Sequence, residues 1–102
     1  MTGTTTDYFS GSEYRVLETE QFQRDLREIT RFGQPAVAAK LRAVVYPQLV
    51  AHPHFGPSIR KLKGYAPPTW RYRIGVWRFF YEIDEGRRVV SMVAAFHRGS
   101  AY

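Results

Sequence analysis

Residues 70–81, WRYRIGVWRFFY, predict two β-strands joined by a tight turn. In the first half, apolar side chains alternate with arginines, which is the period-two pattern of a half-buried strand. Gly75-Val76 forms the loop, because glycine tolerates the positive φ at the first position of a type II′ turn. One face of the hairpin should therefore enter a core, and the other should carry arginines suited to phosphate. The core face comprises Trp70, Tyr72, Ile74, Trp77, Phe79, Tyr81 and Ile83, and the opposite face Arg71, Arg73, Arg78, Phe80 and Glu82.

The part of the chain before this hairpin predicts a strand and two helices. Residues 13–18 (EYRVLE) alternate as a short strand, and Thr19 is a suitable N-cap for a helix from residue 20 to about 31. Its apolar positions 22, 26 and 29 form one stripe. Gly33 should end this helix, and Pro35 should open a second helix that runs to about residue 50.

The second helix should bury one face, and it contains a proline. Because Pro47 removes a backbone donor, we expect a kink or an early end near Val45. The predicted buried face is Val37, Leu41, Val44, Val45 and Leu49.

The remaining segments complete a β-α-α-β-β-β order. Residues 51–58 form a loop, 59–65 lead back into the sheet, 66–69 turn before the hairpin, and 84–86 turn after it. Residues 88–95 are nearly all apolar, which predicts a final strand buried on both faces, followed by a polar tail over 97–102. We expect the α+β class, with two N-terminal helices on one face of a small, mainly antiparallel sheet. The face with Arg71, Arg73 and Arg78 would be the uncovered one, so that Arg78→Ala should not unfold the domain.

Length and composition limit the class of protein. The 102 residues suit one domain over 13–102, preceded by a Thr-, Gly- and Ser-rich tail over 1–12 that we expect to be flexible. The absence of cysteine excludes disulfides, thiolate chemistry and cysteine-based zinc sites. We see neither an apolar run of membrane-spanning length nor a secretory signal, so we expect a cytoplasmic protein without a membrane partner.

The positive charge is concentrated in the C-terminal half. Residues 1–59 hold six Lys/Arg and six Asp/Glu, whereas residues 60–102 hold nine Lys/Arg and three Asp/Glu, which supplies the whole net charge of +6. Between Arg60 and Tyr81 there are six basic residues and no acidic one. This asymmetry favours a polyanionic partner, most simply nucleic acid, over a basic surface that only binds water.

Several short motifs follow one another in an order that resembles the RelE/ParE family of type II toxin–antitoxin toxins. They are Leu62-Lys63-Gly64, then residues 70–75 (WRYRIG), then Arg78 with Tyr81, and finally His97-Arg98 with Tyr102. The resemblance covers about residues 13–102.

The resemblance to the RelE branch implies an mRNA endoribonuclease that cuts in the ribosomal A site without metal or other cofactor. The 2′-hydroxyl attacks the adjacent phosphate, and a cognate antitoxin covers the site. The family's basic strand positions match Arg71 and Arg73, its hairpin arginine Arg78, its C-terminal arginine Arg98 and its terminal tyrosine Tyr102. By their chemistry, His97 or Tyr102 would transfer protons, whereas Arg60, Lys61 and Lys63 would contact RNA backbone.

The residues also leave other functions open. Arginine stands where the family has lysine on the first hairpin strand, and a guanidinium hardly ever deprotonates, so it is a poor base. The ParE branch shares the fold but poisons DNA gyrase without a nuclease site, and this is the alternative function. A third is a member that only binds antitoxin. His52 and His54 suggest no metal site, because no third ligand is evident.

Overall fold

The computed structural model describes residues 14–31 and 35–99. The tail over 1–12, Gly33 and Tyr102, for which the sequence makes predictions, lie outside these residues. The elements are β1 (Arg15–Glu18), α1 (Glu20–Arg31), α2 (Pro35–Lys40), the π-helix η1 (Leu41–Val45), α3 (Tyr46–Ala51), β2 (Ile59–Lys61), β3 (Thr69–Ile74), β4 (Trp77–Asp84) and β5 (Val89–His97).

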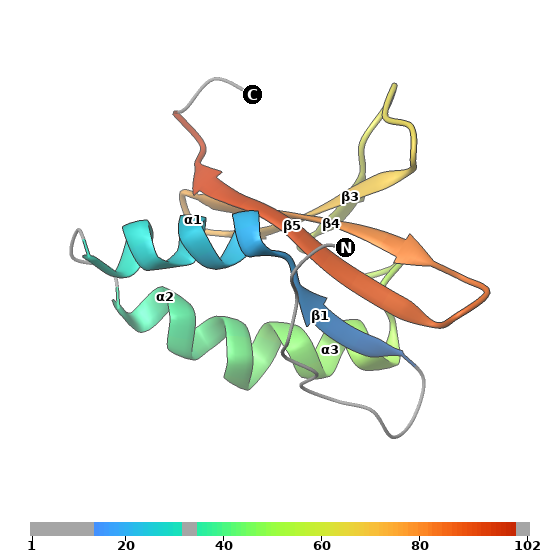
Figure 1. Cartoon of the computed structure of the whole chain (residues 1–102), viewed down its shortest axis with the longest axis horizontal. Coiled ribbons are helices and arrows are strands. Elements are labelled where there is room, and N and C mark those ends of the chain that lie inside the picture. Colours follow the sequence, from blue (N-terminus) through green and yellow to red (C-terminus); the bar gives the residue numbers. More distant parts are fainter. Residues whose placement is uncertain (1–13, 32–34, 100–102) are drawn as a thin grey trace.

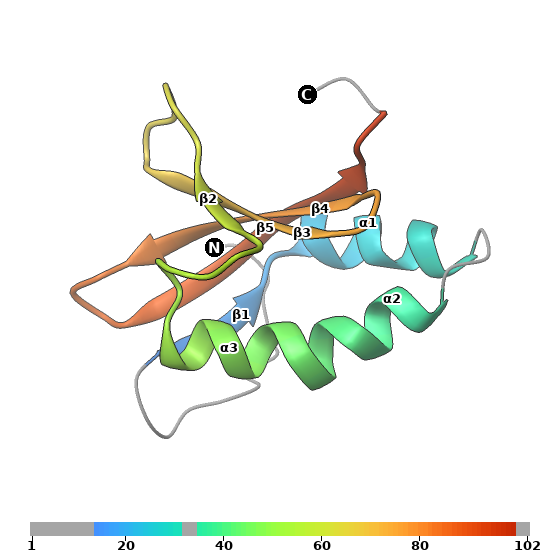
Figure 2. The ribbon, with the colours of Figure 1, turned by 180° about the vertical axis from the view of Figure 1, so that it is seen from behind.

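The strands form one sheet in the order β1-β5-β4-β3-β2. β1 pairs with β5 in parallel, and the other neighbours are antiparallel. The helices lie together below this sheet, and its upper face is not covered by them (Figures 1 and 2). The predicted α+β class with helices on one face is therefore confirmed, and the segment after the loop adds the short edge strand β2.

The central hairpin has the two faces that its alternation predicts. Tyr72, Phe79 and Tyr81 are buried in the core, and Trp70, Ile74, Trp77 and Ile83 pack against it. Gly75 opens the β3–β4 turn with φ of 55°, as a turn with glycine in first position requires. Because Arg71 pairs with Phe80 and Arg73 with Arg78, these side chains belong to the opposite, open face.

Helix α1 begins at the predicted cap. The Thr19 hydroxyl accepts a hydrogen bond from the Phe22 N–H at 3.2 Å, and it also donates to the Met92 carbonyl at 2.9 Å. The cap therefore satisfies an orphan N–H of the first turn and fixes the helix to β5. The predicted stripe of Phe22, Leu26 and Ile29 is buried.

The second helix is interrupted by the π-helix η1, so the prediction for its buried face is wrong at one position. Val44 is 49% exposed, whereas Val45 and Tyr46 are fully buried. The Tyr46 N–H donates to the Leu41 carbonyl, five residues back, and this wider turn changes the residues that face the core. The disturbance stands just before Pro47, near the expected kink, and the helix continues to Ala51.

The prediction that the last strand is buried on both faces is wrong. Along β5, Val90, Met92 and Ala95 are buried, whereas Ser91, Ala94 and Phe96 are only half-buried. The helices cover one side of the strand, and the other side belongs to the open face.

Two segments rise from the sheet on the side away from the helices. One is the connection between β2 and β3, and the other is residues 98–99, which leave β5 at the opposite end of the sheet (Figures 1 and 2). They flank the open face of the sheet. Within residues 14–31 and 35–99, no helix is long and apolar enough to cross a membrane.

Candidate nucleic-acid interface

The strand register arranges the open face in three rows across the sheet. The first row runs Ser91, Glu82, Thr69; the second runs Ala94, Phe80, Arg71, Arg60; the third runs Phe96, Arg78, Arg73. Side chains in one row stand about 4.5–5.5 Å apart at Cβ, and rows are close enough for long side chains to meet. Arginines and aromatic rings therefore share the centre of this face.

The face contains two pairs of arginines directly opposite each other. Arg60 on β2 pairs with Arg71 on β3, and Arg73 on β3 pairs with Arg78 on β4. Like charges at directly opposed positions destabilise a sheet. Arg60 and Arg73 are exposed, so their guanidinium groups are accessible to an anion, whereas Arg71 is half-buried and its Nε is shielded from solvent.

Arg78 is less accessible than its position predicts. Only 8% of the residue is exposed, because the side chain folds over the β3–β4 turn. Its Nη1 donates hydrogen bonds to the carbonyls of Gly75 at 2.8 Å and Trp77 at 3.1 Å. We expected that Arg78→Ala would not unfold the domain because we expected an exposed side chain, and that exposure is wrong: the side chain is buried and holds the hairpin turn.

Aromatic rings stand in the same rows of the open face as the arginines. The rings of Phe80 and Phe96 meet edge to face with centroids 4.8 Å apart, and the Tyr65 ring stands perpendicular to Phe80 at 6.0 Å. Phe80 is buried, whereas Tyr65 is 44% exposed. Tyr65 comes from the β2–β3 connection and covers Phe80 from the solvent side.

His97 lies on the other face of the sheet from these arginines. It pairs with Trp77, and its ring contacts the Trp77 ring at 5.2 Å on the side that packs toward the helices. Its Nδ1 accepts a hydrogen bond from the Gly99 N–H at 3.0 Å. The structure thus does not bring His97 together with Arg71 and Arg73.

The other candidate residues are distributed around the open face. Arg98 lies beside the β3–β4 turn, because its N–H donates to the Val76 carbonyl at 2.7 Å. Lys61 faces the helix side, with Nζ 5.7 Å from the centroid of Trp70. Lys63 is exposed in the β2–β3 connection. Arg98 and Lys63 thus flank the arginine face, and Lys61 does not belong to it.

Glu82 belongs to this face, as the alternation predicts, although no sequence motif indicates a role for it. It stands between Thr69 and Ser91 in the first row, diagonal to Arg71 across the β3–β4 pair. Such diagonal neighbours are within reach of long side chains. The alternation of the hairpin residues places Glu82 on the face opposite the apolar core, and this alternation was the signal that could have identified it.

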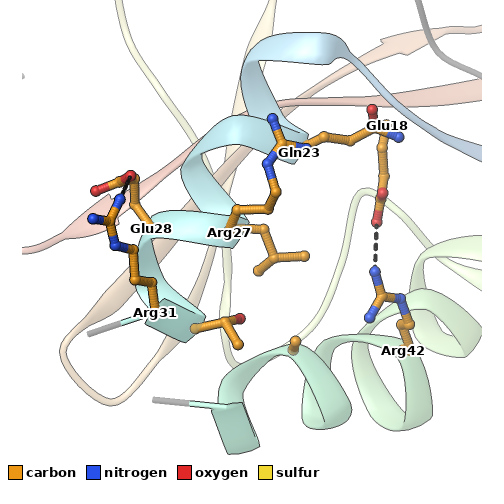
Figure 3. Close-up of a pocket in the computed structure, with 9 residues that line it drawn as sticks. Glu18, Gln23, Arg27, Glu28, Arg31 and Arg42 are labelled. Carbon is orange, nitrogen blue, oxygen red and sulfur yellow. Dashed lines mark ion pairs between the residues drawn. The ribbon is translucent and has the colours of Figure 1, made fainter. Parts of the chain in front are cut away.

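A concave region lies between α1 and the helical segment α2–η1, with a volume of about 760 Å³ (Figure 3). Glu18 lies at its inner side, only 2% exposed, where it accepts a hydrogen bond from the Tyr46 hydroxyl at 2.5 Å. Arg42 Nη2 lies 3.9 Å from the same carboxylate. At the rim, Arg31 and Glu28 form an ion pair at 3.7 Å. Most charges of this groove are thus matched within the chain.

A smaller pocket of about 460 Å³ lies at the end of α3. His54 Nε2 donates a hydrogen bond to Glu85, and the Tyr14 hydroxyl donates to the same carboxylate at 2.8 Å. These two hydrogen bonds, that from His54 first, lower the pKa of Glu85 below its ordinary value. In the described part of the chain, no group of three or more His, Asp or Glu side chains could hold a metal ion.

Comparisons with known proteins show the family and the fold. The model of one family, described as ParE toxin of type II toxin-antitoxin system, parDE, matches residues 16–102. The fold is similar to a chain of the RelBE2 toxin–antitoxin complex from Mycobacterium tuberculosis, with a TM-score of 0.70, 23% identity, and coverage of 93% of this chain and 100% of that one. A chain of the archaeal RelE–RelB complex from Pyrococcus horikoshii gives a TM-score of 0.51, 23% identity, and coverage of 88% and 100%. No curated protein matches the sequence.

Proposed function

This chain belongs to the RelE/ParE family of type II toxin–antitoxin toxins, and we propose that it is an mRNA endoribonuclease of that family. The enzyme would need no metal or other cofactor. It would cut mRNA in the ribosomal A site, in the cytoplasm, and so inhibit translation.

The opposed arginines of the open face carry this proposal. Arg60 with Arg71, and Arg73 with Arg78, place like charges across neighbouring strands, which costs stability in the free protein. A phosphodiester backbone would neutralise Arg60, Arg71 and Arg73, and a guanidinium binds two phosphate oxygens at once. Arg78 would keep its hydrogen bonds to the carbonyls of Gly75 and Trp77. The same face carries aromatic rings, on which nucleobases can stack. A site for phosphate alone would not need them.

The proposed reaction is an in-line attack within the RNA. The 2′-oxygen forms a bond to the adjacent phosphorus as the bond to the 5′-oxygen breaks, which leaves a 2′,3′-cyclic phosphate and a 5′-hydroxyl. Arg71 and Arg73 would stabilise the charge on the phosphorane oxygens, with Arg98 near the β3–β4 turn, while Arg78 supports the turn. Glu82 would take the proton of the 2′-hydroxyl, and Tyr102 or water would give one to the leaving oxygen.

An antitoxin would control the activity by covering the open face. Two of the structural relatives come from toxin–antitoxin complexes, RelBE2 and RelE–RelB. For this chain, an acidic antitoxin segment would meet the arginine pairs and compete directly with RNA.

A ParE-like gyrase inhibitor is the second candidate, and one observation favours it. His97 lies on the helix side of the sheet, so the face with the arginines lacks that histidine as a proton donor. A binding protein would need no such group. In that case the basic face would dock on DNA gyrase, with or without its DNA.

Induction in cells distinguishes the two functions. Primer extension on a reporter mRNA should show new 5′ ends after induction of the toxin, and they should disappear when the start codon of that mRNA is removed. Arg71→Gln should abolish the cuts, whereas Arg24→Gln on the exposed side of α1 should leave them unchanged. Intact mRNA together with DNA breaks and an SOS response would reject the nuclease and support gyrase as the target.

A further inference from the structure

Tyr65 is a large aromatic side chain that the fold does not need to bury. It stands in the connection between β2 and β3 and remains 44% exposed, although its ring contacts Phe80 edge to face. Its hydroxyl makes no hydrogen bond to another described residue. One side of the ring therefore rests on the open face, and the remaining surface is available to a ligand.

The surroundings of Tyr65 are cationic. Lys63 precedes it by two residues and is exposed, and Phe80, on which Tyr65 rests, pairs with Arg71, which in turn pairs with Arg60. No acidic residue occurs between positions 60 and 81. An aromatic ring beside several cations is the combination that binds single-stranded nucleic acid, because bases stack on the ring while the backbone meets the cations.

We propose that Tyr65 is a stacking platform for an unpaired nucleobase of single-stranded RNA, next to the phosphate bound by Arg60 and Arg71. The proposal rests on the proposed function and adds a binding subsite to it. In this arrangement Tyr65 is a positioning residue, which holds one nucleotide so that the neighbouring phosphate lies over the arginines.

The geometry favours a single strand over a duplex. In a duplex the faces of the bases are already stacked on one another, so an isolated ring such as Tyr65 has nothing to bind. A single strand can turn one base outward onto the ring. Stacking of this kind tolerates any base, but it is stronger for purines, which have the larger surface, so adenine should be preferred over uracil.

The test measures binding without cleavage. Fluorescein-labelled 2′-O-methyl oligoribonucleotides of 12 residues, one of adenine, one of uracil and one with abasic sugars, cannot undergo attack by the 2′-oxygen. Their affinities for the full chain are compared by fluorescence anisotropy for wild type, Tyr65→Ala, Tyr65→Phe and Phe55→Ala. Phe55 is the matched control, because it is 78% exposed in the loop after α3, beside His54 rather than on the arginine face.

The expected result is specific to the aromatic ring. Tyr65→Ala should bind the adenine oligomer roughly 5- to 150-fold more weakly, the span of stacking on one base, and should lose the preference for adenine. Tyr65→Phe should keep the wild-type affinity, since it retains the ring. Phe55→Ala should behave as wild type, and the abasic oligomer should bind wild type and Tyr65→Ala alike. Unchanged melting temperatures of the variants will exclude a folding defect.

Three outcomes would overturn the inference. If Tyr65→Ala binds every oligomer like wild type while Arg71→Gln binds weakly, the stacking site is wrong and the nuclease function stands. If Tyr65→Phe loses as much affinity as Tyr65→Ala, the hydroxyl rather than the ring is responsible. If the wild type binds none of the oligomers and Tyr65→Ala instead weakens an antitoxin peptide, Tyr65 is a protein contact, and RNA binding fails with it.

Discussion

Arg60 on β2 and Arg71 on β3 are directly opposite each other on the face that the helices leave open. An opposed pair of like charges costs a sheet up to about 1 kcal/mol relative to neutral residues. Such a cost persists in a small domain when a ligand requires the charges, since sequences depart from locally stable choices mainly at functional sites. Stability and binding should therefore respond in opposite directions when this pair is changed.

Replacement of Arg60 by glutamine should weaken RNA binding without weakening the fold. The free energy of unfolding in urea should stay the same or rise by up to about 1 kcal/mol, because the repulsion with Arg71 is removed. The slope of log K against log salt concentration should become shallower by about 0.7, because each phosphate of a single strand that the protein neutralises contributes about that much and the variant neutralises one fewer.

Arg24→Gln is the control for this measurement. Arg24 is exposed on α1, which lies on the helix side of the sheet, and it donates to Gln21 at 3.0 Å. It carries the same charge, so a general electrostatic effect would appear in both variants. Equal salt slopes for the two variants would show that Arg60 contacts no phosphate.

Arg78→Ala should destabilise the domain, in contrast to Arg73→Ala. The guanidinium of Arg78 is buried and donates to two carbonyls of the hairpin turn, and hydrogen bonds of charged groups contribute about 1.5–3 kcal/mol. Arg73 is exposed, so its removal should change stability by less than about 0.5 kcal/mol. Urea unfolding of both variants checks this difference, and equal stabilities would contradict it. Loss of toxicity in Arg78→Ala alone therefore does not identify a catalytic group.

Local periodicity predicted the central hairpin correctly, but it did not predict where His97 points. Along β5, Tyr81 pairs with Met92 and Phe80 with Ala94, so Val93 is an extra residue in the strand. This bulge shifts the alternation by one and turns His97 toward the helix side. A strict period of two would have placed His97 on the open face, and a bulge depends on the partner strand rather than on the local sequence.

Two other differences have the same kind of cause. Val44 is exposed because η1 widens the helix. Arg78 is buried because its side chain folds over the β3–β4 turn and donates to a carbonyl there. A pattern of residue types shows which face a residue belongs to in regular structure. It does not show where regular structure is interrupted, or which way a long side chain folds.

Tyr46→Phe should cost stability although it removes a single oxygen. The Tyr46 hydroxyl donates to the carboxylate of Glu18, and both residues are buried between β1 and the helices. Removal of this donor should destabilise the domain by about 1.5–3 kcal/mol, the contribution of a hydrogen bond to a charged group. The loss should not be larger, because the carboxylate keeps the guanidinium of Arg42, 3.9 Å away, as an ion-pair partner. Thermal or urea unfolding measures it. Tyr65→Phe, which alters an exposed hydroxyl, is the matched control and should leave stability unchanged.

Acid should remove a contribution of Glu85 to stability. Hydrogen bonds from His54 and Tyr14 lower the pKa of Glu85 in the folded state below the ordinary 4.5. A carboxyl group whose pKa is lower in the folded than in the unfolded state stabilises the protein at pH values above its unfolded pKa. This contribution disappears as the pH falls through the folded pKa. The stability of wild type relative to Glu85→Gln should therefore be greatest above pH 4.5 and decrease below it. Because Glu85 is largely exposed, the effect should be small, and a constant difference from about pH 6 to about pH 3 would contradict it.

Glu82→Gln should separate RNA cleavage from RNA binding. Glu82 stands diagonal to Arg71 on the open face, where its carboxylate could take the proton from an attacking 2′-hydroxyl. Loss of this base should slow cleavage by about 10²- to 10⁴-fold in single-turnover assays. Binding of a 2′-O-methyl oligomer should stay equal or become tighter, because a negative charge leaves a phosphate site. Glu20→Gln, in the exposed first turn of α1, should change neither quantity. Normal cleavage by Glu82→Gln would exclude this carboxylate as the base and leave Tyr102 as the residue to test.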